Sequence, residues 1–282
     1  MSHFSKHVFT SADVHHFVQN GYVRLPQLLT ADAYQVLADA IENMSTNPHD
    51  DALVSIDSST ALVSGIDDIL RADPATFLPL LGDPLLLSIA EAICGVDFFP
   101  VQSFSVIKTL GSKDPILWHQ DVLTRPLSKT FMLGIYLDDA TEENGALRII
   151  PQSHKSPLPI CELEKMPYES IEMKAGEILI HDLMLVHSSG ILTTFPQRRV
   201  VYFEFMSSSQ AIEEQIYPTE SILSRVGLIP LAIQAYQQKY PNAEAFEWKH
   251  PEKDFFSQNI TPDRVHNATL RLKPANYCLF EP

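Results

Sequence analysis

Two tripeptides place a histidine and an aspartate two residues apart, and such a pair could bind a metal ion. His119 and Asp121 follow the strand-like residues 116–118. On an extended backbone, side chains two residues apart point to the same face, so this imidazole and this carboxylate should converge. The other tripeptide, at residues 49–51, follows Pro48 in a polar stretch, where we expect a solvated loop instead of a rigid site.

A metal held by one histidine and one aspartate needs a further ligand from another segment. Two histidines and one carboxylate form the facial triad that binds Fe(II) and leaves coordination positions open for substrates. His181 and His187 both lie in the largely apolar run 176–190 and could supply the third ligand. Periodicity does not choose between them, and either could instead be a core histidine that bonds to the backbone.

The elements that must position these residues are strands. From residue 101 onward the chain alternates between polar and apolar side chains, with breaks rich in glycine or proline. The strand-like runs are residues 102–108, 130–137, 177–181 and 198–205, and near the end of the chain 269–272 and 277–280. Many short strands with few helices between them predict an antiparallel sandwich or barrel.

Helical signals dominate the first hundred residues. Three helices are predicted there from their end signals, from Ser11 to Gly21, from Thr30 onward, and from Asp83 with Pro84 to Gly95. Residues 46–76 are rich in Asp, Ser and Asn and predict an irregular surface connection. Residues 210–250 turn helical again.

Composition excludes several classes of protein. The 282 residues carry 20 Lys+Arg against 35 Asp+Glu, a formal charge of −15, which argues against nucleic acid or an anionic membrane as a partner. We find no apolar run long enough to span a membrane and no apolar signal core in residues 1–10. Three widely spaced cysteines, Cys94, Cys161 and Cys278, fit neither a disulfide framework nor a zinc cluster. We therefore expect a reduced, cytoplasmic protein.

Several motifs, in order along the chain, resemble those of the phytanoyl-CoA dioxygenase family. They are residues 118–121, 137–154, 187–189 and 198–199, within a match that extends over about residues 10–206. The chain departs from the family pattern at Gln152, where glycine is usual, and at Glu177, where aspartate is usual. The resemblance implies a non-haem Fe(II)- and 2-oxoglutarate-dependent oxygenase. It also implies a mainly β fold with flanking helices, the double-stranded β-helix (jelly roll, cupin-like).

The family's site residues transfer by position onto this sequence. The resemblance implies the metal ligands His119, Asp121 and His187. It implies that Arg198 grips the far carboxylate of 2-oxoglutarate, which suits a planar guanidinium, and that Ser189 assists it. Gln102 resembles a glutamine that contacts the cosubstrate in ectoine hydroxylase. Strand alternation should turn Arg199 outward.

The expected activity is hydroxylation of a small metabolite with Fe(II), 2-oxoglutarate and O₂, in secondary or amino-acid-derived metabolism. The presence of Asp121 argues against halogenation, because halogenases of this chemistry have Ala or Gly in place of that carboxylate, which makes room for chloride. Cyclisation, desaturation or epoxidation on the same fold remains an alternative. Two further alternatives are a non-catalytic jelly-roll binding protein and a nucleic-acid demethylase. The demethylase would need a basic groove, which the negative net charge argues against.

The substrate is expected to be a small free metabolite and not an acyl-CoA, because coenzyme A carries several phosphates and a chain at −15 would repel it. Arg125 and Arg148 could hold one carboxylate of that metabolite, although each could equally be a surface salt bridge.

We expect a single oxygenase domain spanning 1–282, with N-terminal helices at 10–96 and a jelly-roll core at 100–206 plus 267–281. Its helical insert at 210–250 could serve as a lid, as core packing or as a dimer contact, and the oligomeric state is left open.

Overall fold

The computed structural model describes residues 2–48, 53–122, 130–258, 261, 265, 268 and 275–278. The strands are β1 (Tyr22–Leu25), β2 (Leu53–Ile56), β3 (Val63–Asp67), β4 (Phe98–Thr109), β5 (Ile116–Gln120), β6 (Thr130–Tyr136), β7 (Leu147–Ile149), β8 (Glu169–Ile171), β9 (Ile178–Asp182), β10 (His187–Ser189), β11 (Gln197–Ser207) and β12 (Asn276–Tyr277). The helices are α1 (Ser11–Asn20), α2 (Ala31–Thr46), α3 (Ile69–Ala72), α4 (Pro74–Leu81), α5 (Pro84–Cys94), α6 (Ile160–Leu163), α7 (Ser208–Glu213), α8 (Thr219–Val226), α9 (Leu228–Lys239) and α10 (Lys253–Gln258), with a 3₁₀ turn at Ser153–Lys155.

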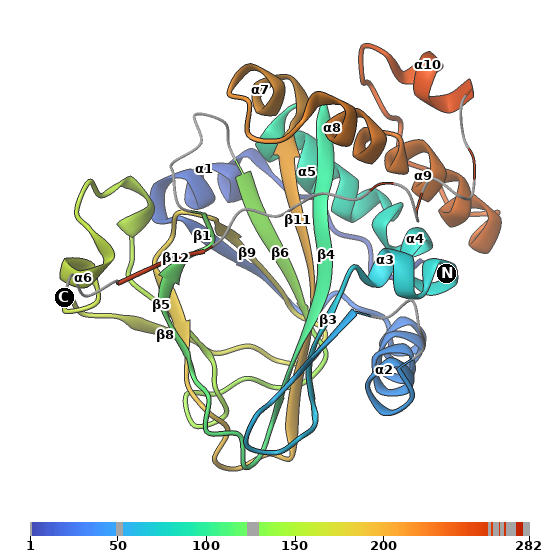
Figure 1. Ribbon diagram of the computed structural model, residues 1–282. Helices are drawn as coiled ribbons and strands as arrows, with labels where there is room; N and C mark the ends of the chain where they lie inside the picture. Colours follow the sequence, from blue (N-terminus) through green and yellow to red (C-terminus); the bar gives the residue numbers. More distant parts are fainter. Residues whose placement is uncertain are drawn as a thin grey trace.

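Two antiparallel sheets face each other and form the body of the molecule (Figure 1). The larger sheet has the strand order β2-β3-β4-β11-β6-β9-β1, and the smaller has the order β12-β5-β10-β7-β8. Apart from β2–β3, β3–β4 and β7–β8, neighbouring strands in both sheets are not consecutive in sequence, as in a jelly roll. The predicted double-stranded β-helix with flanking helices is therefore confirmed.

Alternation along β11 separates two cores. Val201, Phe203 and Phe205 point out of the barrel into the larger hydrophobic cluster, whereas Val200 and Tyr202 point inward into a smaller one. Every residue of β11 after the first is buried, because helices cover one face of the larger sheet and the smaller sheet lies over the other. The inward positions of this strand therefore line the space between the sheets.

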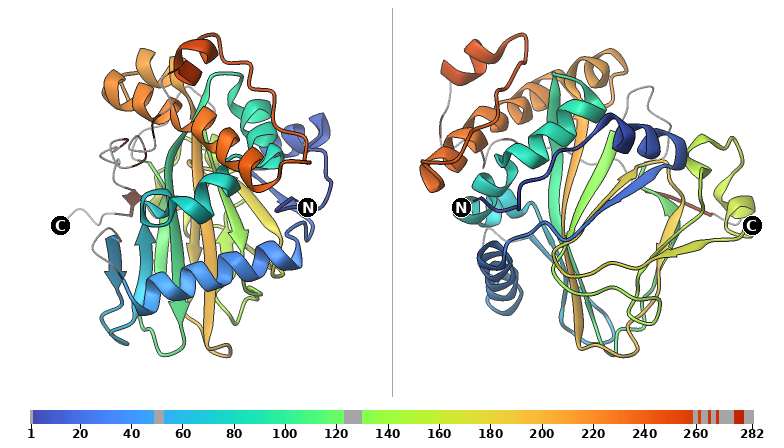
Figure 2. Two further views of the ribbon diagram at one scale, coloured as in Figure 1. Left: turned by 90° about the vertical axis from the view of Figure 1, so that its right-hand side faces the viewer. Right: turned by 180° about the vertical axis from the view of Figure 1, so that it is seen from behind.

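Helices cover the outer face of the larger sheet, while the smaller sheet lies on its other side (Figures 1 and 2). The insert predicted at residues 210–250 belongs to this layer. Helix α9 packs along α4, and α8 packs against β4. Apolar side chains of both helices, such as Ile222 and Ile229, are fully buried in the larger cluster. The segment thus has a packing role, and a lid function for it stays a prediction.

The predicted helix ends are confirmed at three helices. Thr10 and Asp13 form a reciprocal capping box at α1, which ends at Gly21 with a positive φ of 85°. Thr30 caps α2, and Asp83 caps α5 just before a proline. Within the described residues, no single helix is long and apolar enough to cross a membrane, and only the pair α4 and α5, bent by 54°, passes that test jointly.

The expectation of an irregular connection at residues 46–76 was wrong in part. The described portion contains the hairpin β2–β3, which extends the larger sheet beyond β4, and then α3. Strand β2 is mostly exposed and lies at the sheet edge, so it lacks the alternation that burial imposes on a strand. Residues 49–51 lie outside the described part of the chain.

The expectation that no cysteines pair was also wrong. A disulfide joins Cys161, in α6, to Cys278, which follows β12, and Cys94 is free. The strand-like run at 269–272 lies outside the described residues. Of the run at 277–280, Tyr277 is in β12.

We predict that Gly82→Ala destabilises the fold. A Cβ at Gly82, the residue that ends α4, would collide with the backbone carbonyl of Ala232 in α9, and no side-chain rotation can relieve that contact. Overpacking of this kind costs roughly 1–3 kcal/mol. Gly65→Ala is the matched control, because the nearest atom to its Cβ would lie at an ordinary 3.5 Å. Thermal unfolding should show a lower Tm for the first variant only, and equal Tm values would contradict the packing of α9 on α4.

Candidate functional site

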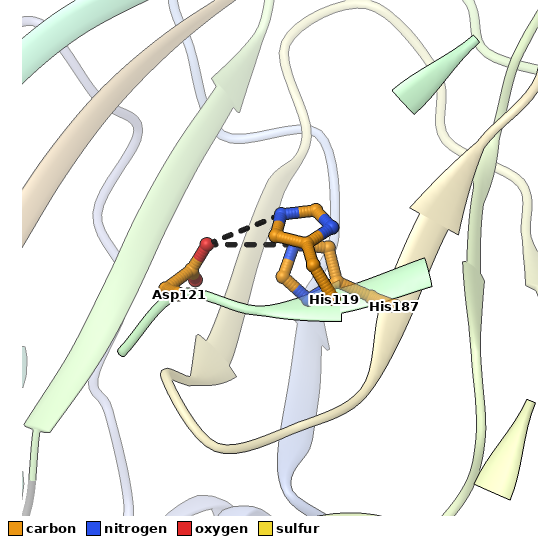
Figure 3. Close-up of side chains that lie close together, drawn as sticks. All are labelled: His119, Asp121 and His187. Atoms are coloured by element: carbon orange, nitrogen blue, oxygen red, sulfur yellow. Dashed lines mark ion pairs between the residues drawn. The ribbon is translucent and has the colours of Figure 1, made fainter. Parts of the chain in front are cut away.

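His119, Asp121 and His187 meet in the smaller sheet (Figure 3). Strands β5 and β10 pair so that His119 and His187 are direct neighbours, and Asp121 follows the end of β5. Oδ1 of Asp121 lies 3.5 Å from Nε2 of His119 and 3.7 Å from Nε2 of His187. One ligand atom from each residue lies within 4.8 Å of the other two.

Backbone hydrogen bonds fix the orientation of both imidazoles. Nδ1 of His119 lies 2.8 Å from the carbonyl of Leu117, and Nδ1 of His187 lies 2.8 Å from the carbonyl of Leu185. A carbonyl only accepts, so each Nδ1 carries a proton, and in the neutral ring each Nε2 has a lone pair that a metal can accept. Two such nitrogens and one carboxylate fit a divalent transition metal, and this donor set is typical of Fe(II) oxygenases.

The electrostatics keep most of these groups in the protonation state that binds a metal. Burial, together with the neighbouring His119, lowers the pKa of His187 to about 3. Burial opposes ionisation of Asp121, but the surrounding imidazoles outweigh it and hold the pKa of this carboxyl well below its usual range. Burial also disfavours charge on His119, yet its hydrogen bond to Asp121 raises the His119 pKa in the metal-free protein.

His181 contacts the Asp121 carboxylate but is not part of the group formed by His119, Asp121 and His187. It comes from β9 in the larger sheet, and its Nε2 lies 3.3 Å from Oδ2 of Asp121, the oxygen that does not face the other imidazoles. Among the described residues its buried Nδ1 has no hydrogen-bond partner. The geometry therefore distinguishes His187 from His181 as the candidate metal ligand, which the spacing in the sequence could not do.

Arg198 and Ser189 lie together in the same cavity as the His–Asp–His group. Both donate to the carbonyl of Gly145, Arg198 through Nη1 and Ser189 through Oγ at 3.0 Å. The Arg198 side chain is 2% exposed, and its Nε is buried with no partner in the described structure. The cavity measures about 90 Å³, and Phe104 and Tyr202 are among its walls. A buried guanidinium with an unused donor fits a carboxylate ligand.

Lys108 is a cation that the sequence analysis missed. It pairs in register with Arg198, and its Nζ donates to the carbonyls of Ser189 and Gly190 at 2.9 and 2.6 Å. Burial, together with the charges of Arg198 and Arg148, lowers the pKa of Lys108 to about 7. Its even spacing from Gln102 on one strand was the signal that both side chains face inward.

Gln102 lies at the opposite end of the strands from Arg198. It is paired in register with Glu204, and its Nε2 donates to the Glu204 carboxyl. Glu204 is six residues from Arg198 on the same face of β11, roughly 20 Å along the strand. Burial raises the pKa of Glu204 to about 8. The sequence analysis missed Glu204, although strand alternation from Arg198 pointed to it.

The remaining arginines are dispersed. Arg199 points outward and pairs with Asp138 at 2.9 Å, as alternation predicts. Arg148 lines a separate groove of about 330 Å³, outside the smaller sheet, beside Trp118 and Tyr277. Arg125 lies outside the described residues.

Comparison with known proteins agrees with this architecture. The family model described as "Phytanoyl-CoA dioxygenase (PhyH)" matches residues 17–200. The chain is 23% identical to phytanoyl-CoA dioxygenase domain-containing protein 1 of Danio rerio, over 76% of this chain and 97% of that protein.

Solved structures share the fold. EctD from S. alaskensis with 2-oxoglutarate and 5-hydroxyectoine has a TM-score of 0.64 at 21% identity, over 72% of this chain and 77% of that one. The epimerase SnoN from nogalamycin biosynthesis has a TM-score of 0.58 at 22% identity, over 70% and 82%. EvdMO1 is 27% identical with a TM-score of 0.60, and the match spans 69% of this chain but about half (49%) of the EvdMO1 chain. Since the family model covers most of the sequence, this protein belongs to the phytanoyl-CoA dioxygenase family of iron- and 2-oxoglutarate-dependent oxygenases.

Proposed function

We propose that this protein is an Fe(II)- and 2-oxoglutarate-dependent dioxygenase that hydroxylates a small metabolite. His119, Asp121 and His187 would hold the iron, and Arg198 with Ser189 would hold the far carboxylate of 2-oxoglutarate. The observation that carries this proposal is the shared cavity, in which a buried, incompletely bonded guanidinium lies with the convergent His–Asp–His group.

When bound, iron with 2-oxoglutarate and O₂ supplies the oxidation that yields succinate and CO₂ and removes hydrogen from a substrate C–H bond. The chain supplies orientation and a dry site. His181 holds Oδ2 of Asp121, which leaves Oδ1 facing the two ligand imidazoles. Phe104, Met132 and Tyr202 wall the cavity with apolar surface, which excludes water.

The substrate would lie toward Gln102 and Glu204, because Arg198 and Lys108 occupy the other end of the same inward faces. A carboxyl and a carboxamide there favour a small, polar partner. Glu204 is buried among few charges, chiefly Asp121 and Arg225. The chain's acidic balance favours a free metabolite over a coenzyme A thioester.

Hydroxylation is the outcome we favour, because Asp121 occupies the place that a halogenase frees for chloride. Cyclisation, desaturation or epoxidation could follow from the same hydrogen removal. The decisive experiment is a screen of small metabolites for those that stimulate succinate formation by the Fe(II)-loaded protein under isotopically labelled O₂. A labelled alcohol supports the proposal, a chlorinated product in chloride buffer contradicts the outcome, and failure to convert 2-oxoglutarate at all contradicts the function.

His187→Ala should abolish Fe(II) binding, whereas His181→Ala should keep most of it. The first variant removes one nitrogen of the His–Asp–His group, and the second removes only a contact to Oδ2 of Asp121. The loss of affinity in His181→Ala should not exceed about tenfold, the low end of the range for residues that orient a metal ligand. Equilibrium titration with Fe(II) under anaerobic conditions distinguishes the two. Equal loss in both variants, or loss in His181→Ala alone, would refute the assignment.

Arg198→Ala should weaken 2-oxoglutarate binding while leaving Fe(II) binding intact. Removing one partner of a buried charge pair costs roughly 2–5 kcal/mol, a loss of about 30-fold or more. Arg199→Ala is the matched control, because that neighbouring arginine points outward to Asp138. The measurement is the dissociation constant of 2-oxoglutarate for the iron-loaded protein. An unchanged constant in Arg198→Ala would show that another cation, such as Lys108, anchors the cosubstrate.

Glu204→Gln should make stability less dependent on pH. The pKa of Glu204 is raised from 4.5 to about 8, so the stability contributed by the neutral carboxyl is present below pH 4.5 and is lost as pH rises toward and through 8. Glutamine keeps the shape and a hydrogen bond to Gln102 but cannot ionise. The Tm of Glu204→Gln relative to the unaltered protein should therefore rise between pH 5 and pH 9. A difference that stays constant over this range would show that Glu204 titrates normally.

A further inference from the structure

The C-terminal strand β12 lies against the strand that carries His119. It forms the edge of the smaller sheet next to β5, with Asn276 opposite Gln120 and Tyr277 opposite His119. The Asn276 side chain also donates to the side-chain oxygen of Gln120 at 3.3 Å. In Figure 1, β12 runs beside β5 toward α6. A segment from the far end of the chain thus contacts the candidate metal site directly.

The Tyr277 ring stacks on the His119 ring. Their centroids are 5.2 Å apart and their planes differ by 18°. The other ring neighbour of His119 is His187, at 4.1 Å. The bond from Nδ1 to Leu117 fixes one atom of the His119 imidazole, and the stacked phenol restrains the tilt of its plane. A ring with both restraints presents Nε2 in one direction.

Two residues of pairing are too few to hold a strand in place without other support. Cys278, the next residue, supplies it through the disulfide to Cys161 in α6. Helix α6 is itself anchored, since Ile160 and Leu163 are buried in a small apolar cluster with Val186, the residue before His187. The disulfide therefore ties Tyr277 to the same packing unit that supports the second candidate ligand.

We propose that Tyr277 is a positioning residue for His119 and that the Cys161–Cys278 disulfide holds it there, so that iron affinity depends on the redox state of this disulfide. The proposal rests on the proposed function insofar as His119 is an iron ligand. A dithiol would open the Cys161–Cys278 disulfide. It transfers two electrons and two protons to the S–S bond, giving two protein thiols while the dithiol closes to its own disulfide. Cys278 lines the outer groove, so such a reductant can approach it.

The first test compares Tyr277→Ala with Tyr277→Phe. Loss of the ring should weaken Fe(II) binding about tenfold, in the range for residues that orient a ligand, and phenylalanine should restore it because the stacking surface is kept. Tyr168→Ala is the control, because Tyr168 is an exposed aromatic residue whose ring packs, tilted by 57°, against Trp118 instead of His119. The readout is the Fe(II) dissociation constant, measured anaerobically against a chromophoric chelator. A merely structural tyrosine would lower Tm without changing this constant, and that result would overturn the proposal.

The second test changes the disulfide. The protein is reduced with dithiothreitol, desalted anaerobically so that no dithiol competes for iron, and titrated with Fe(II). Reduction and Cys278→Ser should each weaken binding to the level of Tyr277→Ala, and reduction should have no further effect on Cys278→Ser. Cys94→Ser, which removes the free cysteine, should behave like the unaltered protein.

Equal Fe(II) affinity in the oxidised and reduced protein would contradict the proposal that iron affinity depends on the disulfide. Reduction needs no substitution, so the test survives if a cysteine variant fails to fold. If the unaltered oxidised protein binds no Fe(II), the proposed function fails. If it binds Fe(II) and the Tyr277 and cysteine variants bind it equally well, only the positioning role fails.

Discussion

The pairing of β5 with β10 sets His119 directly opposite His187, and the chemistry of the molecule depends on that register. A slip of one residue in β10 would turn the His187 imidazole to the outer face, away from His119 and Asp121. The pairing is irregular just beyond this point, where Ser189 lies opposite Ile116. That irregularity allows Ile116 and Ser189 to line the same cavity as the histidines. One short ladder thus places both histidines of the candidate metal site and Ser189 of the adjoining cavity.

The long strands β4 and β11 determine the length and direction of the site. Their inward faces carry Lys108 and Arg198 at one end and Gln102 and Glu204 at the other. Across the larger sheet, Glu204 lies beside Met132, which lies beside His181. Buried polar and charged groups are costly unless they are bonded. Here the Gln102 side chain donates to Glu204, and Lys108 donates to the carbonyls of Ser189 and Gly190. The two-residue period of the strands suffices to produce this arrangement.

Features that depend on local sequence could be predicted, and features that depend on distant contacts could not. The helix caps at Thr30 and Asp83 and the inward face of β11 follow from neighbouring residues. His181 and His187 could not be separated by periodicity, because residues 183–186 carry the chain from one sheet to the other between them. The Cys161–Cys278 disulfide spans 117 residues and depends on where β12 docks. The inward orientation of Lys108 and Glu204 was not predicted, because a charged residue on a strand ordinarily faces solvent.

The charge distribution reconciles an acidic protein with an anionic cosubstrate. At physiological ionic strength the field of the net charge of −15 is screened within roughly 8 Å of the surface. Inside the barrel, Arg198 and Lys108 act over shorter distances with little solvent between them, and among the described residues neither has a carboxylate partner. A small dianion that enters the cavity therefore meets uncompensated positive charge. Under the proposed function, the net negative charge of the chain would therefore not prevent a small anion from binding deep in its core.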